Sequence, residues 1–388
     1  MARLGHPADR DRYFKLFKRN DDHTLFFLSF STQATADIVA VTIPILALYL
    51  HASPFEIGLL ATSRGVVYAV CPFIAGYALG RVNRRRVLLS ATIIDLVAAL
   101  LFYFSLAPLE LISVRLFEGF ALAMFWPTLE SLIVKKKPSN GPDPLRGFNV
   151  SWGFGQMMGP IIAGCVITFF DVRLPFLVAA GALVANIALI LRYGKSRSQM
   201  SNESDGSPVS AQRMPVPLVL AITFLGAIAS IFFAFFPVFG TALGISAFEL
   251  GVMLFFFGLI RVFFFSKAPK IKAGLHSRIL LASLGFFLVY LGNRFIMYVG
   301  VVLVGAALSL IYAYTLEYAL QGDDLSVRRR AGMFEGLLGI GSMVGPFLAG
   351  FVAEFSYAYT FMMVVLASLL LVVGLKLSGP PRDLRVLL

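Results

Sequence analysis

The sequence predicts an all-α membrane protein in which twelve transmembrane helices form two pseudo-symmetric six-helix bundles. The 388 residues are 58% hydrophobic and only 14% charged, with a mean hydropathy of +0.83, well outside the range of water-soluble domains. Apolar runs of about 17 to 25 residues, long enough to cross a hydrocarbon core as helices, recur along the whole chain. An apolar motif also occurs twice, as "GQMMGPIIAG" at 155–164 and "GSMVGPFLAG" at 341–350.

Twelve apolar runs are predicted to span the membrane. In chain order they are 24–50, 57–79, 87–106, 109–134, 147–169, 173–192, 216–243, 250–266, 278–292, 295–320, 332–354 and 357–377. The ninth run is the shortest, and it ends against the polar residues Asn293 and Arg294. Spans nine and ten are therefore expected to share a tight outer turn.

The basic residues sort by side of the membrane. With a cytoplasmic N-terminus, the inner segments hold 28 of the 33 Lys and Arg residues, whereas the outer segments hold only Arg173 and Arg294. This asymmetry follows the positive-inside rule and predicts a multi-pass protein of the cell membrane with both termini in the cytoplasm. Topology thus accounts for the net charge of +12, and nucleic-acid binding is not expected.

Polar intervals predict the segment boundaries. Residues 1–23 are polar and precede a full-length apolar run, so no cleavable signal peptide is expected. Within them, "RYFKLFKR" is compatible with an interfacial helix or with a disordered basic tail. The predicted organisation is a cytoplasmic segment 1–23, a first bundle 24–192, a flexible Ser-rich cytoplasmic linker 193–215, a second bundle 216–377 and a cytoplasmic tail 378–388.

Several sequence matches between the two halves predict an internal duplication. The repeated apolar motif lies in span five of the first half and span eleven of the second. "SPFEIGLL" at 53–60 matches "SAFELGVM" at 246–253, and "TLE" at 128–130 matches 315–317. Because six spans return the chain to its starting side, both halves have the same orientation and are expected to enclose a cavity between them.

A loop signature links this architecture to a known family. The segment "GYALGRVNRR" between spans two and three contains the glycine and arginines of that signature, at Gly76, Arg81, Arg84 and Arg85. It resembles the loop of the major facilitator superfamily of secondary transporters, although Gly80 and Asn83 replace an acidic residue and a second glycine of the family pattern. The resemblance covers essentially the whole chain and implies alternating access by rocking of the two bundles.

Two further motifs support the resemblance. Span four contains Arg115 and Gly119 in the Arg-x3-Gly spacing of many family members. Span five resembles the drug and proton exchangers of the family at Gly155, Gly159, Pro160 and Gly164, and span eleven repeats the pattern at Gly341, Gly345, Pro346 and Gly350. Arg146 stands where the first glycine of the exchanger pattern belongs. Small residues at this spacing favour close helix packing and the proline permits bending, so both copies are interpreted first as packing and hinge sites. The resemblance implies that spans five and eleven lie where the two bundles meet.

Charged residues deep in the membrane are candidates for function, because a charge there costs about 2.5 to 3.5 kcal/mol on insertion scales unless it has partners or water. Asp37 lies mid-span in the first helix and is predicted to carry the proton, with Arg115 and Glu118 as its partners. The alternative is a permanent Arg115–Glu118 pair, with Asp37 hydrogen-bonded locally. Asp95 in span three is a weaker candidate.

Arg64 in span two and Arg261 in span eight form a second candidate pair. Their repeat-related positions predict that two guanidinium groups face each other and bind an anionic solute, with Asp37 also near the substrate. The alternative is that each arginine pairs with a backbone carbonyl. Glu130 and Glu317 are repeat equivalents near the basic inner loops, and the resemblance implies that they and the loop signature stabilise a closed inner gate.

Taken together, these features predict a secondary active transporter that moves a small organic solute by alternating access. Proton-coupled export is the leading hypothesis, and a carrier of small anions recognised by Arg64 and Arg261 is the alternative. The four histidines fall outside the spans, so an enzyme is not expected, and neither are a cofactor or a bound metal. The expected partners are the solute, protons and lipid, and the resemblance implies a monomer.

Overall fold

The computed structural model describes residues 7–78, 83–134, 144–193, 214–267, 274–319 and 324–377, and every regular element in these ranges is an α-helix. In chain order the helices are α1 (Pro7–Tyr49), α2 (Pro54–Ala78), α3 (Arg84–Phe104), α4 (Pro108–Val134), α5 (Pro144–Phe169), α6 (Leu174–Tyr193), α7 (Val216–Ala242), α8 (Ala247–Lys267), α9 (Leu275–Tyr290), α10 (Arg294–Ala319), α11 (Asp324–Ala353) and α12 (Tyr357–Leu377). The helices match the twelve predicted spans in number and order. Helix α9 has only 16 residues, consistent with the short ninth run.

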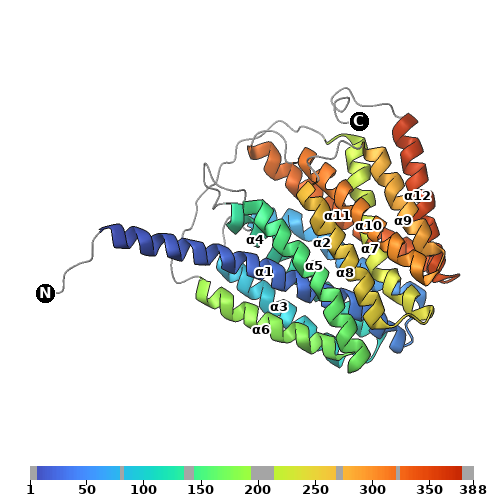
Figure 1. Ribbon diagram of the computed structural model, residues 1–388, viewed down its shortest axis with the longest axis horizontal. Coiled ribbons are helices and arrows are strands. Elements are labelled where there is room, and N and C mark those ends of the chain that lie inside the picture. The colour runs from blue at the N-terminus through green and yellow to red at the C-terminus, as the bar shows by residue number, and fades with distance from the viewer. Residues whose placement is uncertain are drawn as a thin grey trace.

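The helices form a bundle from which the first part of α1 projects (Figure 1). The basic segment that precedes the first predicted span is a helical continuation of α1 from Pro7 onward rather than a separate element. Nearly all of the predicted linker 193–215 and all of the tail 378–388 lie outside the described residues, so the predicted domain boundaries remain predictions.

The repeated motif makes equivalent contacts in the two halves. A Cβ atom added to Gly155 of α5 would lie against the Phe30 carbonyl oxygen of α1, and one added to Gly341 of α11 would lie against the Thr223 carbonyl oxygen of α7. The two partners are separated by 193 residues, the same offset that relates the matching segments at 53 and 246. These paired contacts confirm two pseudo-symmetric six-helix bundles.

The bundles meet along two helix pairs, α2 with α11 and α5 with α8. A Cβ atom on Gly58 of α2 would stand 2.6 Å from the Pro346 carbonyl oxygen of α11. In the symmetric position, a Cβ atom on Gly251 of α8 would stand 2.6 Å from the Pro160 carbonyl oxygen of α5. Backbones this close require glycine, so the predicted location of α5 and α11 between the bundles is confirmed.

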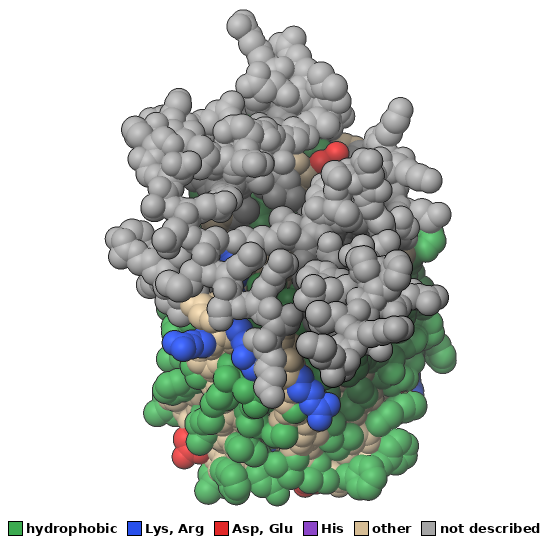
Figure 2. Space-filling view, turned by 90° about the vertical axis from the view of Figure 1, so that its left-hand side faces the viewer, with side chains coloured by type: hydrophobic (Ala, Val, Ile, Leu, Met, Phe, Trp, Pro, Cys, Tyr) green, Lys and Arg blue, Asp and Glu red, His purple; other side chains and the backbone are tan. Residues whose placement is uncertain are grey.

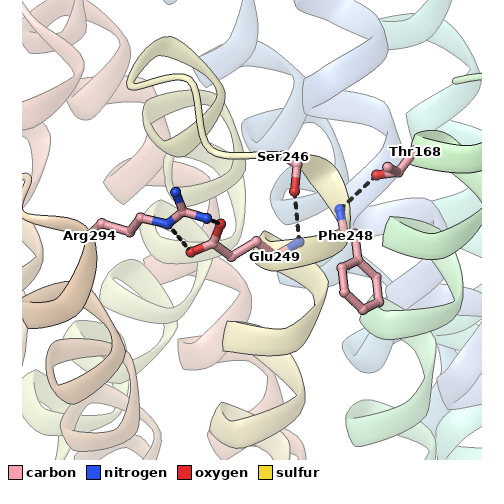
Figure 3. A network of polar contacts seen from close by, with 5 residues as sticks. All are labelled: Thr168, Ser246, Phe248, Glu249 and Arg294. Atoms are coloured by element: carbon pink, nitrogen blue, oxygen red, sulfur yellow. Dashed lines mark hydrogen bonds and ion pairs between the residues drawn. The ribbon is translucent and has the colours of Figure 1, made fainter.

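Two hydrogen bonds from backbone N–H groups to side-chain oxygens also join the bundles at the ends of these helices. The Phe248 N–H at the start of α8 donates to Thr168 Oγ1 of α5 at 2.9 Å (Figure 3). The Phe55 N–H at the start of α2 donates to Glu354 Oε1, just after α11, at 2.8 Å. The first turn of a helix has N–H groups without an intrahelical acceptor, and here the opposite bundle supplies the acceptor.

Hydrophobic side chains cover much of the described part of the face shown in Figure 2. Large apolar residues are exposed on several helices, including Phe104 at 69% and Leu370 at 72%. In the described part of the chain, nine helices are long and apolar enough to cross a membrane. An apolar exterior of this kind suits contact with acyl chains, and the protein is a multi-pass membrane protein.

Candidate functional site

Asp37 is buried in the membrane-spanning part of α1, with 5% of its surface exposed. Gln33, one turn earlier, donates a hydrogen bond from Nε2 to Asp37 Oδ2 at 2.7 Å. The repeated motif of α5 packs against this part of α1, because a Cβ atom on Gly159 would stand 2.6 Å from the Ala34 carbonyl oxygen and 2.8 Å from Asp37 Cβ. The predicted acid and the predicted packing motif are therefore in direct contact.

Asp37 lies within the electrostatic range of three arginines. The guanidinium groups of Arg64, Arg261 and Arg115 each interact with its carboxylate. The sequence predicted two groups that share Asp37, one with Arg115 and Glu118 and one with Arg64 and Arg261. The charges of all three arginines act on Asp37 in the structure, so we describe the two groups as one central charged cluster.

Arg115 and Glu118 form a buried ion pair on α4. The distance from Arg115 Nη1 to Glu118 Oε2 is 2.5 Å, and the side chains are 9% and 1% exposed. Glu118 Oε1 has no hydrogen-bond partner among the residues that the structure describes. The alternative to proton transfer that the sequence left open is a permanent Arg115–Glu118 pair with Asp37 hydrogen-bonded locally. This conformation contains both contacts, the Arg115–Glu118 pair and the Gln33–Asp37 hydrogen bond.

Gly119 positions Arg64 beside that ion pair. A Cβ atom on Gly119 would stand 3.3 Å from Arg64 Cα, so the absence of a side chain lets α4 approach α2 closely. Asp95 of α3 is also buried, and its carboxylate interacts electrostatically with Glu118, Arg64 and Arg115. The central charged cluster therefore comprises three acids and three arginines: Asp37, Asp95, Glu118, Arg64, Arg115 and Arg261.

Arg261 connects the two bundles within this cluster. Its guanidinium carbon lies 5.0 Å from the ring centroid of Trp152 on α5 and 5.5 Å from that of Phe257 on its own helix. Such stacking over aromatic faces is favourable for a guanidinium group. Sequence reasoning missed Trp152, although its place one turn before the glycine motif could have indicated it.

The two repeat-related acids nearer the inner end, Glu130 and Glu317, have different neighbours. Glu130 of α4 interacts electrostatically with Glu335 of α11, which the sequence reasoning missed. Its repeat equivalent Glu317 is exposed and interacts instead with Arg278, a member of the basic segment predicted to face it. The two equivalent glutamates therefore have different surroundings.

The loop signature is described only in part. Arg81 lies outside the described residues, Gly76 lies in the last turn of α2 and Arg84 begins α3. Arg85 donates from Nε to the Ile190 carbonyl oxygen of α6 at 3.0 Å and from Nη2 to that of Leu191. These contacts lie within the first bundle, so a role of Arg85 in closing an inner gate remains a prediction.

Comparison with known proteins places the chain in a family. The model of the Major Facilitator Superfamily matches residues 25–322. The chain is 22% identical over 330 residues to the proton-coupled antiporter flippase LtaA of Staphylococcus saprophyticus, covering 80% of this chain and 82% of that protein. It is 28% identical over 172 residues to the multidrug resistance protein MdtG of Klebsiella pneumoniae, covering 42% of this chain and 41% of that protein.

A solved structure supports the same fold. A variant of the nucleoside transporter NupG superposes with a TM-score of 0.77 at 17% identity, covering 91% of this chain and 98% of that chain. The likeness shows the fold, and the family match shows that the protein is a transporter rather than an enzyme. The chain belongs to the major facilitator superfamily of membrane transporters.

Proposed function

We propose that the protein is a proton-coupled secondary transporter that exports a small organic solute by alternating access, with Asp37 as the proton-carrying acid. The observation that carries the proposal is the position of Asp37, buried in mid-membrane, in contact with the α5 motif and within the field of three arginines. We also infer from the charge asymmetry that both termini are cytoplasmic, and we propose that the functional unit is a monomer.

The cluster provides a physical route for coupling. A deprotonated Asp37 is held by the arginine charges, whereas a protonated Asp37 is neutral and loses that attraction. Because Gly159 of α5 touches Asp37 while Gly251 of α8 touches Pro160 of α5, a change at Asp37 is adjacent to the bundle interface. Proton binding and the relative position of the bundles can therefore influence each other.

The relatives give the proposal further support. The two similar proteins are a proton-coupled antiporter flippase and a multidrug resistance protein. Both descriptions fit export of an organic compound in exchange for protons. The substrate of the present chain is proposed only at the level of a small organic solute.

A second candidate function is a carrier of small anions. The observation that favours it is the convergence of three guanidinium groups, with Arg261 held against the opposite bundle by Trp152. Arginine forks suit bidentate recognition of carboxylates and oxyanions. In this case Arg64 and Arg261 would contact the solute itself.

Exchange in liposomes separates the two functions. Ethidium and radiolabelled succinate serve as the cationic and anionic probes, and a pH gradient is imposed across the membrane. We expect Asp37→Asn to reduce gradient-driven ethidium exchange by at least about tenfold, while Asp171→Asn, a matched change at an exposed loop residue, leaves it intact. Full gradient-driven exchange by Asp37→Asn would rule out the proposed proton role.

Succinate exchange tests the second candidate function. If the protein is an anion carrier, the double change Arg64→Gln and Arg261→Gln should abolish succinate exchange.

A further inference from the structure

Gln156 of α5 is a buried amide that the proposed coupling does not use. It lies between two packed faces of the helix, because Gly155 contacts α1 and a Cβ atom on Gly258 of α8 would stand 2.6 Å from Met157 Cα. Only 3% of Gln156 is exposed, and its Oε1 atom has no hydrogen-bond partner within the described segments. Phe154, on the other side of α5, is 44% exposed.

The neighbours of Gln156 place it at the central charged cluster. Trp152 lies one turn earlier on the same face of α5, and its ring stacks with the Arg261 guanidinium at 5.0 Å. On the other side, a Cβ atom on Gly155 would stand 2.8 Å from Gln33 Cβ, and Gln33 donates to Asp37. The Gln156 amide therefore lies on the part of α5 between α1, which carries Asp37, and α8, which carries Arg261.

The buried acceptor Gln156 Oε1 is expected to receive a hydrogen bond from a donor. Leaving a buried carbonyl oxygen without a hydrogen bond is unfavourable, and nearly all such atoms in proteins are paired. We propose that the Gln156 side chain hydrogen-bonds the transported solute and selects solutes that present an N–H or O–H donor. The proposal rests on the proposed function, because it requires the solute to pass beside the central charged cluster.

Asn186 of α6 supplies a matched control. It is also a fully buried amide with an unpartnered oxygen, Oδ1, in the described structure, and it also contacts α1. Its Nδ2 atom donates to Thr32 Oγ1 at 3.2 Å, on the side of α1 that packs against α6. It therefore resembles Gln156 in burial and chemistry, but it lies on α6, away from the contact between α5 and α8.

The first experiment measures access and does not depend on knowing the substrate. Single cysteines, Gln156→Cys and Asn186→Cys, are introduced after Cys71→Ser and Cys165→Ser, and both vesicle orientations are treated with the membrane-impermeant thiol reagent MTSET. We expect Gln156→Cys to react at least about tenfold faster than Asn186→Cys, because only position 156 is proposed to border the aqueous solute path. Equal rates, or no reaction at position 156, would overturn the proposal.

The second experiment tests the hydrogen bond with two cationic probes. Ethidium carries N–H donors, whereas tetraphenylphosphonium carries none. We expect Gln156→Leu to raise the KM for ethidium by about 3- to 10-fold, the effect of one lost neutral hydrogen bond, with kcat and the tetraphenylphosphonium KM unchanged. Gln156→Asn should restore part of the ethidium affinity, and Asn186→Leu should leave both KM values unchanged. An equal rise for both probes, or no rise for ethidium, would contradict donor selection.

The two proposals fail in different ways. If Asp37→Asn keeps gradient-driven exchange but Gln156→Leu still separates the probes, the proton role falls and the solute contact stands. If Asp37→Asn abolishes coupling but Gln156→Cys is unreactive, the coupling stands and the solute contact falls.

Discussion

Gly159 of α5 packs directly against Asp37 of α1, so closely that a Cβ atom on the glycine would stand 2.8 Å from Asp37 Cβ. Its repeat equivalent, Gly345 of α11, packs in the same way against Ala227 of α7, at 2.7 Å from the alanine Cα. The duplicated motif thus makes the same backbone approach twice, but an ionisable residue is among the nearest neighbours of Gly159, whereas those of Gly345 all belong to Ala227. This difference allows packing and coupling to be separated experimentally.

We expect Gly159→Ala and Gly345→Ala to lower the thermal unfolding temperature to a similar extent. Each added methyl group meets backbone atoms that can move only by separating two helices, at a typical cost of about 1 to 3 kcal/mol. Only Gly159→Ala should also impair proton-driven exchange, because it displaces Asp37. Thermal shift and liposome exchange measure the two effects, and an equal loss of exchange in both variants would show that the motif acts through packing alone.

The buried pair Arg115–Glu118 should contribute far more to stability than the peripheral pair Arg294–Glu249 shown in Figure 3. Glu118→Gln leaves a buried guanidinium group without its closest counter-charge, which typically costs about 3 to 5 kcal/mol. Glu249→Gln removes the partner of a side chain that is 62% exposed, where a pair is worth about 0 to 1 kcal/mol.

Thermal unfolding in detergent measures this difference. The double change Arg115→Met and Glu118→Leu should recover much of the stability that Glu118→Gln loses, because it leaves no unpaired charge at the pair itself. If Glu118→Gln and Glu249→Gln lower the unfolding temperature equally, the buried pair contributes no more to stability than the peripheral pair.

The two backbone contacts between bundles, Phe248 with Thr168 and Phe55 with Glu354, should help to keep this end of the transporter closed. Thr168→Val has the same shape but lacks the acceptor, so we expect it to increase the population in which the bundles separate there. Spin labels on Leu106 and Leu243, which are exposed on opposite bundles, report that separation by double electron–electron resonance.

Thr168→Ser keeps a hydroxyl group and is the matched control for this measurement. Its distance distribution should match that of the unaltered chain, whereas Thr168→Val should gain a longer component. Identical distributions in both variants would mean that the hydrogen bond does not influence closure.

Much of the fold was predictable because membrane helices are specified by local composition and by repeats. The apolar runs predicted all twelve helices, and the family resemblance implied that α5 and α11 lie where the two bundles meet. The depth of a residue in the membrane was also predictable, since it follows from the number of residues between it and the ends of its span. Asp37, Arg115 and Arg261 were therefore correctly placed among the buried residues.

Contacts between helices were harder to predict, because sequence gives depth but not the direction in which a side chain points across the bundle. Arg64 was grouped with Arg261 and Asp37, and its approach to α4 at Gly119, next to Glu118, was not predicted. Repeat symmetry was also an incomplete guide to the partners of acidic residues. It relates Glu130 to Glu317 in separate bundles, but it does not determine which residue each glutamate faces. Glu335 belongs to no motif, and Gln156 is a variable position of the repeated motif, so only the packed structure indicates them.

Arg261 should not tolerate lysine, because its planar guanidinium group stacks on Trp152 of the other bundle. Arg278 is the matched control, since it also lies over an aromatic ring, 4.8 Å from the Tyr314 centroid, but within its own bundle. A lost cation–π contact of this kind costs about 0.5 to 2 kcal/mol, so both lysine variants should unfold at slightly lower temperatures. Only Arg261→Lys should also reduce exchange in liposomes, by at least about tenfold, because only Arg261 joins the two bundles beside Asp37. Retained exchange in Arg261→Lys would show that charge at this position suffices and that the stacked geometry across the bundle interface is dispensable.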